Sequence, residues 1–258
     1  MIIMSRGRGT YNWFNSGFPM VNDRTNSESL LPMFPITFYD DFLGGDVVFP
    51  ATGTVESGTP WSTLILGNGA VAKVADGING IVSLSVVTAA AASIAVLDWN
   101  NQESLKLEQG LIFEARVRIS ILPTMGVAGT TEMVWGLAGT HNAVLDTIDC
   151  NAWFRLQHDA NTVLVWEVDD DVAGDDNDND TGIVIATGDY HIYRIDATTI
   201  AAVKFYVDGV LVGTGDLSGL LATVGDVQPY FNVSKTDGTN TGVGTMLVDY
   251  VRVFQDRS

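Results

Sequence analysis

Hydrophobic and polar residues alternate along most of the chain after Ile36, which is the pattern of β-strands with one buried face. In the clearest case, residues 111–121, Phe113, Val117 and Ile119 fall on one face, and Glu114 and Arg116 fall on the other. Shorter runs of this kind, separated by residues that favour turns, recur at 36–42, 61–66, 80–87, 152–157, 162–168, 190–196, 202–207, 227–233 and 246–254. The pattern predicts an all-β protein, an antiparallel β-sandwich over residues 36–258.

Two local signals support this prediction. Asp208 and Gly209 lie between two apolar runs, and this pair favours a two-residue hairpin whose central residues both have positive φ. The alanine-rich segment 86–97 has β-branched neighbours and no polar face, so it is at least as compatible with a buried strand as with a helix.

Residues 1–35 have neither period, and we predict that they form an irregular N-terminal arm. The arm is slightly basic, with three arginines against Asp23 and Glu28, and it carries scattered aromatic residues. It is either a frayed terminus or a segment that docks on a partner, because arginine and aromatic residues are enriched in buried interface cores. The candidate docking residues are Arg6, Arg8, Tyr11, Trp13, Phe14, Phe18 and Arg24.

Charge and composition narrow the choice of partners. The formal net charge of −18 argues against nucleic acid. No stretch is apolar enough to span a membrane, and Arg6 and Arg8 interrupt any signal peptide, so we expect synthesis in the cytoplasm. The single cysteine, Cys150, excludes an internal disulfide and is interpreted as a small buried hydrophobic residue.

Three segments resemble concanavalin-A-like jelly-roll domains of the bacterial laminarinase and β-glucanase group, glycoside hydrolase family 16. They are YHIYRIDATTIAAVKFYVDGVLVG at 190–213, MLVDYVRVFQ at 246–255 and FYDDF at 38–42. The resemblance implies a jelly-roll sandwich over residues 36–256.

Catalysis in that family depends on an ExDxxE signature, which supplies the paired carboxyl groups that glycoside hydrolysis requires. The nearest match is EVDDDV, in which Glu167 and Asp169 fit but Val172 replaces the acid/base glutamate. TEMVWG at 131–136 offers a single carboxylate, Glu132. We therefore predict that the protein is not an enzyme, and an active β-glucanase is the least favoured function.

The acidic run DDDVAGDDNDND at 169–180 has two interpretations. Asp176, Asp178 and Asp180 nearly match a calcium-binding loop, but Thr181 takes the position of its glycine. We predict an exposed loop whose like charges repel one another, with a structural Ca²⁺ ion at these three aspartates as the alternative and no other cofactor.

A jelly-roll body with a docking arm resembles structural proteins of tailed-bacteriophage virions. We predict a capsid decoration (cement) protein of the virion, a homo-oligomer that docks through its arm on the major capsid protein or other virion subunits. The alternatives are a tail or fibre component and a lectin-like carbohydrate-binding module. Exposed tryptophans would carry sugar binding, and the candidates, each also suited to a core, are Trp99, Trp135, Trp153 and Trp166.

Overall fold

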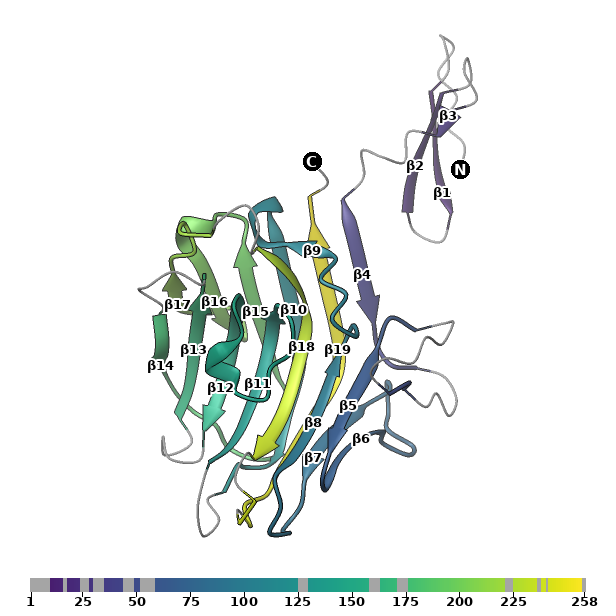
Figure 1. Ribbon diagram of the computed structural model, residues 1–258. Helices are drawn as coiled ribbons and strands as arrows, with labels where there is room; N and C mark the ends of the chain where they lie inside the picture. Colours follow the sequence, from purple (N-terminus) through teal and green to yellow (C-terminus); the bar gives the residue numbers. More distant parts are fainter. Residues whose placement is uncertain are drawn as a thin grey trace. The chain divides into compact units, whose positions relative to one another are not determined.

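The computed structural model describes most of the chain (Figure 1). The described residues are 10–15, 18–23, 28–29, 35–43, 49–51, 59–124, 130–157, 163–170, 176–220, 225–235, 238–239 and 241–256. Within these ranges the regular structure is β-strand apart from single turns of 3-10 helix, η2 (Leu107–Gln109), η3 (Leu145–Thr147) and η4 (Ile200–Ala202). None of the described helices is long and apolar enough to cross a membrane.

The chain divides into two compact units, one of residues 1–36 with 256–258 and one of residues 37–255. The first unit holds an antiparallel sheet of three strands, β1 (Thr10–Asn15), β2 (Phe18–Asp23) and β3 (Glu28–Ser29). The prediction of an irregular arm is wrong for these strands, because backbone hydrogen bonds form a ladder even where hydrophobic alternation is weak.

The candidate docking residues of the arm are only partly covered by the structure. Tyr11, Trp13 and Phe14 lie on β1, and Phe18 opens β2. Arg6, Arg8 and Arg24 lie outside the described residues. Docking of the arm on a viral shell stays a prediction.

The second unit is a sandwich of two sheets, and consecutive strands along each sheet run antiparallel. In order, the first sheet contains β17 (Val210–Gly215), β16 (Val203–Val207), β15 (His191–Ala197), β10 (Leu111–Ile121), β19 (Gly244–Gln255), β7 (Val82–Val86) and β6 (Gly69–Lys73), with β4 (Ile36–Asp40) paired to β19. The second sheet contains β14 (Asp176–Val184), β13 (Val163–Asp169), β12 (Asn151–Gln157), β11 (Thr131–Ala138), β18 (Asp226–Lys235), β8 (Ser93–Asp98) and β5 (Ser62–Leu66), with β9 (Leu105–Lys106) paired to β18. This architecture confirms the predicted jelly-roll β-sandwich.

Aromatic side chains join the two sheets. The ring centroids of Trp135 and Tyr193 lie 4.9 Å apart, those of Phe154 and Tyr193 5.1 Å, and those of Trp166 and Phe205 5.0 Å. Because side chains alternate along a strand, the residues next to Trp135, Phe154 and Trp166 point away from the first sheet. We call this side of the second sheet its outer face.

The local predictions hold where the structure describes them. In β10, Phe113, Val117 and Ile119 are buried as expected. Asp208 and Gly209 have φ values of 50° and 79° and join β16 to β17. Residues 93–98 of the alanine-rich segment form the fully buried strand β8.

All four candidate sugar-binding tryptophans are buried, at 0–9% exposure. The free thiol of Cys150 is buried as well, and burial raises its pKa well above the usual range. The candidate tryptophans therefore offer no exposed ring for stacking on a sugar.

Candidate functional site

The outer face of the second sheet carries a cluster of ionisable side chains that neighbouring strands bring together. Glu132 comes from β11, Arg155 from β12 and Glu167 from β13. The register pairs Val134 with Arg155, and Arg155 in turn with Val165. Arg155 thus lies between the two glutamates, each displaced by two residues along its strand, which keeps all three side chains on one face.

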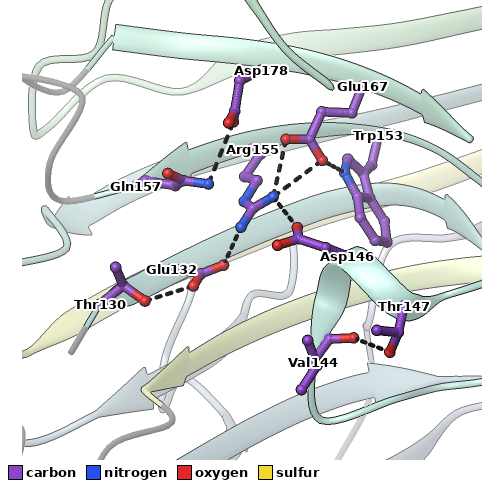
Figure 2. A network of polar contacts seen from close by, with 10 residues as sticks. All are labelled: Thr130, Glu132, Val144, Asp146, Thr147, Trp153, Arg155, Gln157, Glu167 and Asp178. Carbon is purple, nitrogen blue, oxygen red and sulfur yellow. Dashed lines mark hydrogen bonds and ion pairs between the residues drawn. The ribbon is translucent and has the colours of Figure 1, made fainter. Parts of the chain in front are cut away.

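Arg155 is the centre of this cluster (Figure 2). Its Nη2 donates to Glu132 Oε2 at 2.7 Å, and its Nη1 donates to Asp146 Oδ1 at 2.6 Å and to Glu167 Oε1 at 3.1 Å. Thr130 donates its hydroxyl hydrogen to the other oxygen of Glu132 at 2.7 Å. One guanidinium therefore bridges three carboxylates, so the cluster carries an excess of negative charge.

Burial differs sharply among the carboxylates. The Glu167 side chain is 2% exposed and that of Glu132 is 13% exposed, whereas the Asp146 side chain is 62% exposed. Trp153 Nε1 donates to Glu167 Oε2 at 2.5 Å. The cluster therefore extends from a buried floor at Glu167 to a solvent-facing rim at Asp146.

Glu167 is the group whose acidity the site changes most usefully. Burial raises the pKa of Glu167 to about 7, although Arg155 and the Trp153 hydrogen bond lower it and Asp178 raises it again. Burial also disfavours the charge on Arg155, but the surrounding carboxylates outweigh it and raise the pKa of the guanidinium above its usual range. Near neutral pH the site thus contains a permanent cation beside a carboxyl group that can hold or release a proton.

The loop that joins β11 to β12, residues 139–150, covers part of the outer face. We call it the β11–β12 loop, and it contains η3. Leu145 and Ile148 of this loop are 5% and 1% exposed and belong to a buried apolar cluster on the sheet, whose other members are Ile94, Val96, Val134, Ala138, Trp153 and Tyr230. Burial of a Leu or Ile side chain contributes roughly 1.5–3 kcal/mol, so these two residues hold the loop against the sheet.

Polar contacts fix the same loop at several points. Gly139 N donates to Cys150 O at 2.8 Å and closes its two ends. His141 Nδ1 lies 2.6 Å from the Tyr230 hydroxyl oxygen, and Asp146 binds Arg155. The loop is therefore a packed part of the site.

The acidic run is only partly a loop. Its last five residues belong to β14, so the prediction of a loop through residue 180 is wrong there, because pairing with β13 outweighs the low strand preference of Asp and Asn. An irregular register between Trp166 and Val168 accompanies a positive φ of 52° at Asp178. Asp178 is exposed and lies within 3.4 Å of Gln157 Nε2 on β12.

The calcium alternative stays a prediction. Asp178 and Asp180 are exposed, and Asp180 Oδ1 accepts a hydrogen bond from Gly182 N at 2.6 Å. The side chain of Asp176 lies outside the described part of the structure. Among the side chains that are described, no group of three or more His, Cys, Asp or Glu residues could hold a metal ion.

Of the acids considered for catalysis, the structure brings Glu132 and Glu167 together through Arg155, whereas Asp169 ends β13 and Val172 lies outside the described residues. Sequence reasoning missed Arg155 and Asp146. Arg155 gave one available signal: it is a lone arginine within the apolar run AWFRLQ of a strongly acidic chain. A cation in such a run needs buried anionic partners.

Comparison with solved structures places this fold among carbohydrate-active proteins. The chain is similar to a protein of unknown function from Shewanella oneidensis, with a TM-score of 0.56, 11% identity and coverage of 88% of each chain. It is also similar to a Bacteroides ovatus glycoside hydrolase of family 16, from a locus for mixed-linkage glucan and bound to an oligosaccharide product. That match has a TM-score of 0.53 and 15% identity, and covers 84% of this chain and 99% of the other.

A third match is the endo-β-1,4-glucuronan lyase of Trichoderma reesei, with a TM-score of 0.50, 14% identity and coverage of 84% and 94%. No protein-family model matches the sequence. No curated protein matches it either. At these identities the structural matches establish the concanavalin-A-like jelly-roll fold of the family 16 hydrolases.

The prediction that the protein is not an enzyme is corrected by these matches. Structures that share the fold over nearly their whole length include a glycoside hydrolase and a polysaccharide lyase. The prediction relied on a single-strand signature, whereas the carboxylates of the outer face come from β11, β13 and the β11–β12 loop. What this chain itself does is taken up as a proposal below.

The pKa of Glu167 gives a prediction for stability. Its folded-state pKa of about 7 is above the model value of 4.5, so the folded protein binds the proton more tightly than the unfolded chain. The contribution of this group to the free energy of unfolding is therefore greatest below about pH 4.5 and is lost as the pH rises towards 7. Thermal unfolding of the protein and of Glu167→Gln from pH 4 to 8 measures this, since only the wild type carries the titrating group. Curves for the two proteins that stay parallel across this range would contradict the prediction.

Proposed function

We propose that the protein is a glycan-cleaving enzyme, a glycoside hydrolase that acts on a neutral polysaccharide at the outer face of the second sheet. The observation that carries the proposal is Glu167, a buried carboxyl group with a pKa of about 7 beside a second carboxylate. A general acid for glycoside hydrolysis must hold its proton near the working pH, and burial is the usual means of achieving this.

The second carboxylate is Asp146. Its Oδ1 lies 2.6 Å and Glu167 Oε1 lies 3.1 Å from the same Arg155 nitrogen. Two oxygens this close to one atom are nearer to each other than the roughly 6.5 Å minimum typical of inverting hydrolases. The spacing favours the retaining reaction, in which one carboxylate attacks the sugar directly.

In that reaction the Asp146 carboxylate attacks the anomeric carbon while Glu167 gives its proton to the glycosidic oxygen, which leaves as an alcohol. Glu167 then removes a proton from water, and the resulting hydroxide cleaves the ester between the sugar and Asp146. Arg155 orients both carboxylates, and Asp178 raises the pKa of the acid. The products are two shorter glycans, and both carboxyl groups return to their starting states.

Charge favours a neutral substrate over a polyuronate. The chain has a formal net charge of −18, and the cluster places Arg155 among Glu132, Asp146 and Glu167. A polyanionic glycan would be repelled by this surface, and the guanidinium is already engaged by three carboxylates. This argues for hydrolysis of a neutral glucan and against the lyase reaction named for the Trichoderma reesei protein.

The test is incubation with laminarin, mixed-linkage β-glucan and β-1,4-glucuronan, followed by measurement of reducing sugars and of unsaturated sugar products. We expect reducing sugars from at least one neutral glucan and no unsaturated products from glucuronan. Absence of products from both neutral glucans would overturn the proposal, as would unsaturated products from glucuronan.

A further inference from the structure

The position of the β11–β12 loop decides which way a glycan can cross the outer face. The apolar cluster beneath Leu145 and Ile148 takes side chains from several adjacent strands: Trp153 of β12, Val134 and Ala138 of β11, Tyr230 of β18, and Ile94 and Val96 of β8. Leu64 of β5 also packs against it. The loop therefore fills the outer face from β12 to the β5 edge.

The carboxylates lie at the border of the filled half. Arg155 is on β12 and Glu167 is on β13, next to the loop that supplies Asp146 (Figure 2). On their other side, β14 presents exposed Asp178 and Asp180. The site is thus bounded by packed apolar side chains towards β18 and by exposed polar side chains towards β14.

We propose that the β11–β12 loop makes the enzyme act on chain ends, so that it releases short units and does not cut at internal linkages. This inference rests on the proposed hydrolase function. A polysaccharide cut at an internal bond must continue past the carboxylates on both sides, but the β18–β5 side is occupied by Leu145, Ile148 and the residues beneath them. A chain end needs room on one side only, and the β13–β14 side offers it.

The loop can serve as such a wall because its position is fixed from several directions. His141 is held at Tyr230, Asp146 at Arg155, and Gly139 at Cys150. Thr147 Oγ1 also donates to Val144 O at 2.7 Å within the turn. Displacing the loop would break these contacts together with the apolar packing, so glycan binding alone has little with which to move it.

The experiment compares polymer size with the number of bonds cut, using laminarin and mixed-linkage β-glucan. For the wild type we expect reducing sugars to accumulate, mostly as short products, while size-exclusion chromatography shows the remaining polymer little changed. The double substitution Leu145→Ser and Ile148→Ser loosens the wall and is expected to give a larger fall in polymer size for the same number of reducing ends. Val144→Ser is the matched control, because Val144 lies in the same loop with 54% exposure, and it should keep the wild-type pattern.

The outcomes separate this inference from the function on which it rests. An early collapse of polymer size with the wild type would overturn chain-end action and leave the hydrolase intact. Cleavage seen only after the double substitution would also overturn it, because the loop would then exclude chain ends too. Absence of cleavage by all three proteins removes the hydrolase function and this inference with it. Circular dichroism of the double variant shows whether it has kept its fold.

Discussion

Replacing Arg155 with methionine is expected to lower the free energy of unfolding by roughly 3–5 kcal/mol, the cost of breaking a buried ion pair from one side. The guanidinium is 6% exposed and bonds to Glu132, Asp146 and Glu167. Methionine fills much of the same space but leaves Glu132 and Glu167 in a poorly hydrated site with no cation. Their repulsion and their lost hydration are what destabilise the variant.

Urea unfolding at pH 7, followed by tryptophan fluorescence, measures this effect as a shift of the midpoint at an unchanged slope. The matched control is Arg194→Met in the first sheet, where the guanidinium is 40% exposed and pairs with Asp196 at 2.8 Å. An exposed pair of this kind contributes about 0–1 kcal/mol. Adding Glu167→Gln to the Arg155→Met protein removes one buried negative charge and is expected to recover part of the loss. A variant as stable as the Arg194 control would show that Arg155 is not the centre of the cluster.

The fold could be predicted from the sequence because its signals are local. The alternation in residues 111–121 requires one face of β10 to be buried, and Asp208-Gly209 suits the positive φ values of a tight hairpin. Both depend on residues a few positions apart. The strands of the first unit were missed because their apolar residues do not alternate cleanly, while backbone pairing alone defines β1 to β3.

The candidate site could not be predicted in the same way, because its parts meet only through strand register and a loop. Arg155 reaches Glu132 across one strand pair and Glu167 across another, and Asp146 comes from the β11–β12 loop. That loop also buries residues 151–156 of β12 on both faces, which removes the alternation that would have marked an outer face. A search for carboxylates along one strand stopped at Val172 and could not find a set assembled from several elements.

Replacing Glu167 with glutamine is expected to lower kcat on the neutral glucan that the protein cleaves by about 10²–10⁴-fold, the usual contribution of a positioned general acid. Glutamine keeps the shape of the side chain and can still meet Trp153 Nε1 and Arg155 through its carbonyl oxygen, but it has no proton to give the leaving oxygen. Since the wild-type acid has a pKa of about 7, wild-type activity should fall as the pH rises through 7.

The measurement is the rate of reducing-sugar release between pH 4 and 9, with Asp196→Asn as the control. Asp196 is an acid of the first sheet that pairs with Arg194, and its replacement should leave both the rate and its pH dependence unchanged. A substrate whose leaving group is a nitrophenol needs no protonation, so the Glu167→Gln protein should form the glycosyl ester from it at a nearly normal rate. This rescue separates loss of the acid from loss of the fold. A Glu167→Gln protein as active as the wild type on the polymer would place the proton donor elsewhere.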